Sequence, residues 1–210
     1  MSRWSDLRTR VISGVLLVAV VIALTLAHPY SFDAMIAVMA VILLREWHGL
    51  TRTRSPWFLP LGVVYIGAAV AALVYLRHEN VNILLALFAI VWTGDIAAYF
   101  TGKRFGNHKI APSISPGKSW EGLAGSIVAS AAVAALLGNV APIPHAILGA
   151  SLAVVGLLGD LFESALKRRI GVKDSGRLIP GHGGLFDRVD ALLPCAILAA
   201  LALYVRLHIG

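Results

Sequence analysis

The segment 159–167, GDLFESALK, places several chemistry-capable side chains on one helical face. Asp160, Glu163, Ser164 and Lys167 are spaced at i, i+3, i+4 and i+7, and residues at these spacings lie on the same side of a helix. The two acids therefore project together from the end of an apolar segment. Carboxylate oxygens suit Mg²⁺, which keeps several waters and bridges substrate phosphates.

A second acidic pair, Asp187 and Asp190, stands where the last apolar segment begins. At a spacing of i, i+3 the pair is expected to share a helix face, and two acidic helix ends that meet would form a site of hard oxygen ligands. No cluster of Cys and His residues supports a zinc site. Either aspartate could instead be an N-cap that interacts with the helix dipole, and this alternative stays open.

Glycines surround His182 in the stretch PGHGG, residues 180–184. Glycine lets the backbone approach a ligand closely, so His182 is a candidate to contact a phosphate group. The alternative is a solvated turn histidine without a chemical role.

A further acid, Asp95, lies inside an apolar segment. A charge at such a position costs several kcal/mol in a membrane, so it is a functional candidate by default, with a structural salt bridge to another helix as the alternative. Asp95, Tyr99 and Lys103 are spaced at i, i+4 and i+8 and share one face of the expected helix.

The stretch SPGKSWEG, residues 115–122, precedes another apolar segment. We expect Pro116 and Gly117 to form a turn and Ser119 to cap the following helix. Backbone amides at a helix N-terminus bind phosphate well, and Lys118 adds a positive charge. The spacing differs from the Walker pattern, so on its own it is a weak indication of a phosphate site.

Long apolar segments must position these groups. The chain of 210 residues is 58% hydrophobic and only 14% charged, with a mean hydropathy of +0.80, whereas soluble domains are about a quarter charged. A membrane-spanning helix needs about 20 apolar residues. The sequence therefore predicts an all-α polytopic transmembrane bundle of about seven helices, forming a single domain over 1–210 with two polar cytoplasmic loops. The expected segments are 11–28, 33–48, 58–76, 81–101, 121–138, 143–162 and 189–207.

The first of these segments is expected to be a retained helix, because HPYSFD after it offers no convincing cleavage site for a signal peptidase. Trp47 and Trp57 are assigned to the aromatic belt at the membrane interface. The single Cys195 excludes an intramolecular disulfide.

Basic residues are distributed unevenly between the two sides of the predicted bundle. Sixteen of the eighteen Lys and Arg residues fall before the first segment or in alternate connections, and only Arg77 and Arg206 fall on the other side. This positive-inside pattern places the N-terminus and the two polar loops in the cytoplasm and the C-terminus outside. Because the charges follow topology, we expect no nucleic-acid partner; a basic membrane face suits anionic lipids and nucleotides.

Residues 164–190, SALKRRIGVKDSGRLIPGHGGLFDRVD, closely resemble the motif of the phosphatidate cytidylyltransferase (CDP-diacylglycerol synthase) family. The pattern is S-x-x-K-R, four residues, K-D, then P-x-H-G-G-x-x-D-R-x-D, and every position matches. The upstream stretches GDLFES and D-x-x-A-Y-x-x-G-K-x-F-G…SPGKSWEG are further family features, so the catalytic portion is expected at about 93–190. Family members are often longer at the N-terminus, and this chain is expected to be a short form.

The resemblance implies that CTP and phosphatidic acid form CDP-diacylglycerol and pyrophosphate at the cytoplasmic face of the inner membrane. It also implies Mg²⁺, with room for a second cation, and a homodimer. The metal ligands that it implies are Asp160 and Asp187, with Asp190 as a further choice. The expected catalytic residues are Asp187, Asp160, Lys167 and His182. The expected contacts to CTP or lipid phosphate are Asp95, Arg104, Ser115, Lys118, Ser164, Arg168, Lys173 and Arg188.

Two other functions fit part of the pattern. A CTP-dependent polyprenol or phytol kinase would transfer the γ-phosphoryl group to an alcohol and would need a base. A cation-coupled transporter would use the intramembrane acids as an ion path. The unbroken 164–190 motif argues against the kinase. The position of the acids at the ends of the segments, rather than near the bilayer midplane, argues against the transporter.

Overall fold

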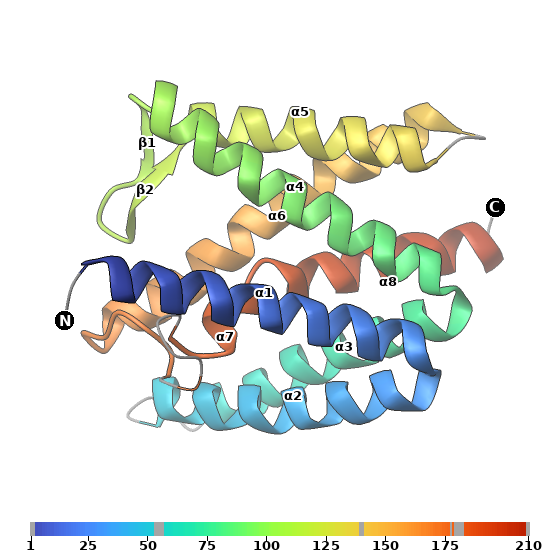
Figure 1. Cartoon of the computed structure of the whole chain (residues 1–210), viewed down its shortest axis with the longest axis horizontal. Coiled ribbons are helices and arrows are strands. Elements are labelled where there is room, and N and C mark those ends of the chain that lie inside the picture. Colours follow the sequence, from blue (N-terminus) through green and yellow to red (C-terminus); the bar gives the residue numbers. More distant parts are fainter. Residues whose placement is uncertain (1–2, 53–56, 139–140, 177, 179–182, 209–210) are drawn as a thin grey trace. The chain divides into compact units, whose positions relative to one another are not determined.

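The computed structural model describes residues 3–52, 57–138, 141–176, 178 and 183–208 (Figure 1). Most of this chain is helical, so the predicted all-α class is confirmed. The elements follow in the order α1 (Arg3–Ala27), α2 (Pro29–Thr51), α3 (Phe58–Glu79), α4 (Val81–Phe105), β1 (Lys109–Ala111), β2 (Ser115–Ser119), α5 (Trp120–Leu137), α6 (Pro142–Arg169), α7 (Phe186–Val189) and α8 (Leu192–His208).

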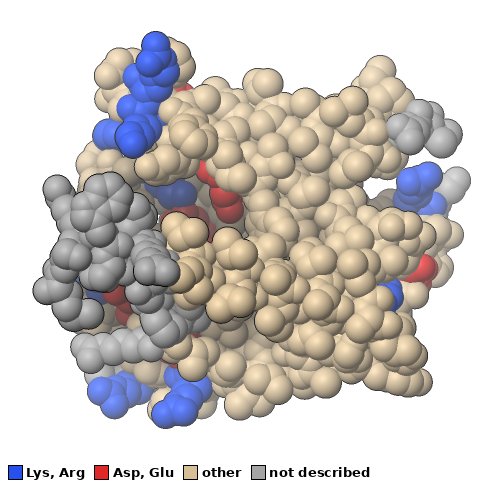
Figure 2. Space-filling view, in the orientation of Figure 1, with Lys and Arg blue, Asp and Glu red and all other residues tan. Residues whose placement is uncertain are grey.

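The long helices account for the predicted membrane segments. Within the described part of the chain, five helices are long and apolar enough to cross a membrane, namely α2, α3, α4, α5 and α6. The apolar stretches Val11–Ala27 of α1 and Leu192–His208 of α8 are shorter. These seven elements overlap the seven predicted segments, and the polytopic membrane architecture is confirmed. Over much of the face drawn in Figure 2 the surface carries neither acidic nor basic side chains, as a lipid-facing surface requires.

The helices are grouped into two compact units, each built from segments that are distant in sequence. Unit 1 comprises Met1–Val81 and Leu166–Val189, and unit 2 comprises Asn82–Ala165 and Asp190–Gly210. Unit 1 therefore holds α1, α2, α3, α7 and the last residues of α6, whereas unit 2 holds α4, the two strands, α5, α8 and most of α6.

A single residue joins α1 to α2 in unit 1. His28 has an extended backbone, and its Nδ1 accepts a hydrogen bond from the Tyr30 N–H at 3.3 Å. The His28 N–H in turn donates to Ser31 Oγ at 3.1 Å, which completes a capping box. Pro29 at the first helical position favours the same start. These residues fix where α2 begins.

The packing of α2 against α3 depends on Trp47. Its side chain is fully buried, and its Nε1–H donates to the Phe58 carbonyl oxygen at 2.8 Å. The ring lies against Gly62 of α3, where a Cβ atom would overlap the indole. The assignment of Trp47 to the interfacial belt is therefore wrong, because this indole finds its hydrogen-bond partner inside unit 1. Trp57 is 79% exposed, as a residue of that belt would be.

Replacing Gly62 by Ala is expected to lower the stability of the protein by about 1–3 kcal/mol, because the added methyl group must displace a buried indole. This change would lower the melting temperature in detergent by several degrees. Gly67→Ala in the same helix is the matched control, since nothing lies within 4 Å of a Cβ atom there. Equal melting temperatures for the two variants would contradict the close packing of Trp47 on α3.

A short antiparallel hairpin precedes α5 in unit 2, and the sequence did not predict it. β1 and β2 pair Lys109 with Ser119 and Ala111 with Ser115. Pro116 and Gly117 therefore lie in a strand and not in the expected turn. The cap prediction is confirmed, because Ser119 Oγ accepts from the Gly122 N–H at 3.1 Å at the start of α5.

Small residues let α4 and α5 approach closely. A Cβ atom at Gly94 of α4 would lie 2.5 Å from Ser130 Oγ and 2.9 Å from Ser126 Oγ of α5. Ser130 Oγ also donates to the Ile90 carbonyl oxygen of α4 at 3.2 Å. In lipid, apolar burial does not drive helices together, so close packing and hydrogen bonds of this kind stabilise the contact between the two helices. They hold Asp95 of α4 beside α5.

Candidate active site

In unit 1, the segment that follows α6 and runs into α7 brings Lys167 and Asp187 together. We call this segment, residues 170–189, the motif loop; the structure describes 170–176, 178 and 183–189 of it. Lys167 comes from the last turn of α6 and Asp187 from α7. The Lys167 ammonium lies 2.6 Å from Asp187 Oδ1, and the two side chains are only 11% and 5% exposed. Removing either partner would take the counter-ion away from a charge that stays buried, which is unfavourable. Two residues expected to be catalytic thus form one ion pair.

The other oxygen of Asp187 is held by the loop itself. Asp187 Oδ2 accepts hydrogen bonds from the Ser175 and Gly184 N–H groups, each at 2.8 Å, and lies 3.0 Å from Ser175 Oγ. Gly183, directly before the second of these donors, has a φ of +85°, a conformation that glycine adopts without steric cost. A Cβ atom at Gly183 would also lie 2.7 Å from Asp187 Oδ2. The glycines of the motif therefore let the backbone close around this carboxylate.

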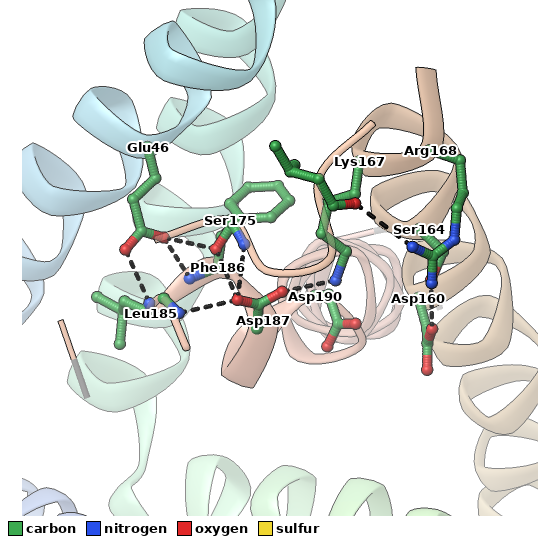
Figure 3. A network of polar contacts seen from close by, with 12 residues as sticks. Glu46, Asp160, Ser164, Lys167, Arg168, Ser175, Leu185, Phe186, Asp187 and Asp190 are labelled. Atoms are coloured by element: carbon green, nitrogen blue, oxygen red, sulfur yellow. Dashed lines mark hydrogen bonds and ion pairs between the residues drawn. The ribbon is translucent and has the colours of Figure 1, made fainter. Parts of the chain in front are cut away.

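The structure adds Glu46 of α2, which was not among the predicted site residues. As Figure 3 shows, its carboxylate points at the same loop. Glu46 Oε1 accepts from the Leu185 N–H at 2.9 Å, and Oε2 accepts from the Phe186 N–H at 2.8 Å. Ser175 Oγ lies 3.0 Å from Glu46 Oε2. The sequence could have indicated Glu46, because it is an acid at the end of an apolar segment. It was missed because the surrounding stretch 45–57 carries three arginines and is typical of a basic cytoplasmic turn.

In unit 2, Lys118 of β2 binds the carboxylate of Asp160 on α6. The two side chains are 30% and 24% exposed. Ser164, one turn further along α6, places its Oγ 3.3 Å from Asp160 Oδ1. The helical spacing of Asp160 and Ser164 is thus confirmed, and the hairpin supplies the cation that faces them.

The charges around Lys118 keep it protonated. Burial by itself would lower the pKa of the Lys118 ammonium. The charge of Asp160 and its hydrogen bond with Lys118 outweigh burial and raise that pKa above its ordinary value. Asp95 and Asp190 act in the same direction. Lys118 is therefore a cation that pairs with Asp160 and is further stabilised by the charges of Asp95 and Asp190.

The remaining predicted residues have less specific contacts. Asp95 lines a small cavity of about 10 Å³ together with Ser126 and Ser130, which is at the lower limit for one water molecule. Asp190 Oδ1 accepts from the Ala191 N–H at 2.9 Å. This amide belongs to the next residue and precedes α8, so the contact is not the one to the second or third helical amide that an N-cap makes. Ser115 begins β2. Four of the predicted basic residues have exposed side chains, namely Arg104, Arg168, Lys173 and Arg188.

The acids of the motif do not all lie on one element. The expectation that Asp187 and Asp190 share the face of one helix is wrong, because α7 ends at Val189 and α8 begins at Leu192. The convergence of Asp160 and Asp187 stays a prediction, since they belong to different units. His182 lies outside the described residues.

The donor chemistry of the two aspartates fits a hard divalent cation. Across the described ranges, no group of three or more His, Cys, Asp or Glu side chains is arranged to hold a metal ion. Asp160 and Asp187 each bind a lysine ammonium, so each carboxylate already attracts positive charge. Carboxylates with few other protein ligands suit Mg²⁺, which completes its shell with water and substrate phosphates.

A large apolar cavity lies elsewhere in unit 2. It has a volume of about 640 Å³ and is lined by residues of α4, α5, α6 and α8, including Asn82, Leu137, His145 and Arg206. Its lining holds none of the predicted site residues.

Comparisons with known proteins agree with the motif. A model of the cytidylyltransferase family matches residues 54–206. A protein of Rickettsia bellii named phosphatidate cytidylyltransferase is 36% identical over 203 residues, which cover 90% of this chain and 87% of the relative.

Proteins with the same name from Brucella suis and Bacillus subtilis are 38% and 40% identical, over 80% and 75% of this chain. The chain spans 63% of the length of each of these two relatives. The chain therefore belongs to the cytidylyltransferase family and, within it, to the phosphatidate cytidylyltransferases.

Proposed function

We propose that this chain transfers the cytidylyl group of CTP to phosphatidate, forming CDP-diacylglycerol and pyrophosphate. The observation that carries the proposal is the Lys167–Asp187 pair, which is buried inside the family motif and held by backbone donors. A fixed ammonium beside a fixed carboxylate suits a reaction between anionic phosphates, where positioning and charge neutralisation supply most of the catalysis.

In this reaction, an oxygen of the phosphatidate phosphate forms a bond to the α-phosphorus of CTP. The bond between that phosphorus and the oxygen that bridges to the β-phosphorus breaks, and pyrophosphate leaves with the electron pair. No covalent enzyme intermediate is needed. Because a phosphate nucleophile is already ionised near pH 7, the site requires no strong general base.

Lys118 and Lys167 are the proposed primary contacts to phosphate oxygens. Each pairs with an aspartate, and a triphosphate carries more negative charge than one carboxylate. We infer that substrate draws the two ammonium groups toward phosphate. The exposed side chains of Arg104, Arg168, Lys173 and Arg188 and the polar residues Asp95, Ser115, Ser164 and His182 complete the proposed set of contacts.

Mg²⁺ is the proposed cofactor, and a second cation is compatible with the same acids. Asp160 and Asp187 would hold it, with Asp190 as a further ligand. Once bound, it would neutralise charge on the phosphate oxygens and orient the nucleophile.

The orientation in the membrane is also part of the proposal. The positive-inside pattern supports a cytoplasmic N-terminus, an external C-terminus and an active site at the inner face of the cytoplasmic membrane. Phosphatidate would then enter from the leaflet and CTP from the cytosol. A homodimer is expected from the family resemblance, and no nucleic-acid partner is expected from the charge distribution.

The test is product formation by the purified protein in detergent micelles that contain phosphatidate. With CTP and Mg²⁺, CDP-lipid and pyrophosphate should appear in equal amounts, and removal of Mg²⁺ with EDTA should abolish both. Omission of phosphatidate is the control and should also abolish both. If neither product forms over a full range of Mg²⁺ concentrations, the proposed function is wrong.

A further inference from the structure

Glu46 lies outside the region that the family model matches, residues 54–206, yet it contacts the motif loop of unit 1. We propose that Glu46 is a positioning residue of the cytidylyltransferase site, because its carboxylate fixes the loop that presents Asp187. This inference rests on the proposed function. It assigns a role in catalysis to a helix that contributes no residue to the motif.

The contact is specific because both oxygens of one carboxylate are used. Oε1 binds the Leu185 N–H at 2.9 Å and Oε2 binds the Phe186 N–H at 2.8 Å. These are consecutive backbone amides immediately before Asp187. A carboxylate that accepts from both amides restricts the backbone conformation at residues 185 and 186. It therefore also restricts the direction in which the side chain of Asp187 points. Hydrogen bonds to a charged acceptor are about twice as strong as neutral ones.

Ser175 links the two carboxylates. Its single hydroxyl oxygen lies 3.0 Å from Glu46 Oε2 and 3.0 Å from Asp187 Oδ2, but a hydroxyl has only one proton to donate. Asp187 Oδ2 already accepts two backbone N–H groups, which fill the two lone pairs of one oxygen. The hydroxyl proton therefore goes to Glu46. Without Glu46 it would turn to Asp187 and compete with the backbone donors.

Two glycines of the loop make room for Glu46. A Cβ atom at Gly176 would lie 2.6 Å from Glu46 Oε1, and one at Gly184 would lie 2.7 Å from both carboxylate oxygens. Next to Glu46, the buried ring of Trp47 contacts Phe186 with a centroid distance of 6.1 Å. The loop is thus shaped around α2, and the carboxylate is held at the loop by the packing of its neighbour.

The test compares Glu46→Ala with Asp33→Ala. Asp33 is on the same helix and forms an ion pair with His78 at 2.9 Å, which Asp33→Ala also removes. Among the described residues of the loop, Glu46 and not Asp33 accepts the Leu185 and Phe186 N–H groups. Glu46→Ala is expected to lower kcat about tenfold, as loss of a residue that orients a ligand does, with KM for CTP nearly unchanged. Hydrogen–deuterium exchange should speed up in peptides that cover residues 183–190. Asp33→Ala should change neither quantity.

Glu46→Gln serves as a second variant if Glu46→Ala folds poorly. Its amide offers one acceptor oxygen in place of two, so its kcat and its exchange rate should lie between those of wild type and Glu46→Ala. An active wild type with equally active Glu46 variants, or with unchanged exchange over 183–190, would overturn this inference alone. A wild type that forms no CDP-lipid would overturn the proposed function and the inference with it.

Discussion

Replacement of Asp187 by Asn is expected to lower kcat by on the order of 10²–10³-fold, comparable to the loss of a group that stabilises a transition state electrostatically. The amide oxygen can still accept from the Ser175 and Gly184 N–H groups, so the loop should keep its shape. The amide nitrogen, however, would face the Lys167 ammonium in place of Oδ1, which lies 2.6 Å from it. The variant would lose the negative charge proposed to bind a cation. Steady-state rates of CDP-lipid formation measure the effect.

Asp33→Asn is the matched control for this change, because it also removes a charged partner within unit 1, in the Asp33–His78 pair. It should leave kcat within about twofold of wild type, as most substitutions away from a site do. Melting temperatures in detergent should show that both variants are folded. A wild-type kcat for Asp187→Asn would contradict the assignment of Asp187 as a metal ligand.

Replacement of Lys118 by Gln is expected to lower kcat/KM for CTP by about 10- to 100-fold, since a hydrogen bond to a charged group contributes about 1.5–3 kcal/mol. The raised pKa of Lys118 means that the wild-type side chain is cationic throughout the working pH range. Lys118→Gln removes that charge and leaves Asp160 without its ammonium. Lys118→Arg keeps the charge and should recover part of the activity. Initial rates over a range of CTP concentrations measure these changes.

Lys109→Gln is the control for Lys118, because Lys109 is an exposed lysine on the partner strand of the same hairpin. It carries no proposed contact and should leave kcat/KM nearly unchanged. If Lys118→Gln and Lys109→Gln weakened CTP use equally, the effect would come from the net charge of the hairpin rather than from a specific phosphate contact.

The sequence predicted well those features that depend on local pattern. Membrane helices follow from runs of apolar residues, so the seven segments overlap the observed helices. The start of α5 was also predictable, since Ser119 caps it through a contact only three residues away. Asp160 and Ser164 meet because helical spacing dictates it. In each case the interacting groups are neighbours in the chain.

Features that depend on contacts between distant segments were not predictable in the same way. Glu46 accepts hydrogen bonds from Leu185 and Phe186, which are more than a hundred residues away in the sequence. The periodicity of apolar residues does not predict a contact between such distant segments. Trp47 was assigned to the membrane interface because indoles are common there, yet its ring is buried against Gly62 of α3. The hairpin was missed because Pro116 and Gly117 favour turns, and strand pairing with 109–111 overrides that preference.

Cytidylyl transfer is tested most directly by following the two ends of the triphosphate of CTP separately. Purified protein should be supplied with phosphatidate, Mg²⁺ and CTP labelled on either the α- or the γ-phosphorus. Label from the α-position should enter the lipid, and label from the γ-position should be released as pyrophosphate. Entry of γ-label into the lipid would show a phosphoryl-transferring kinase and would contradict cytidylyl transfer.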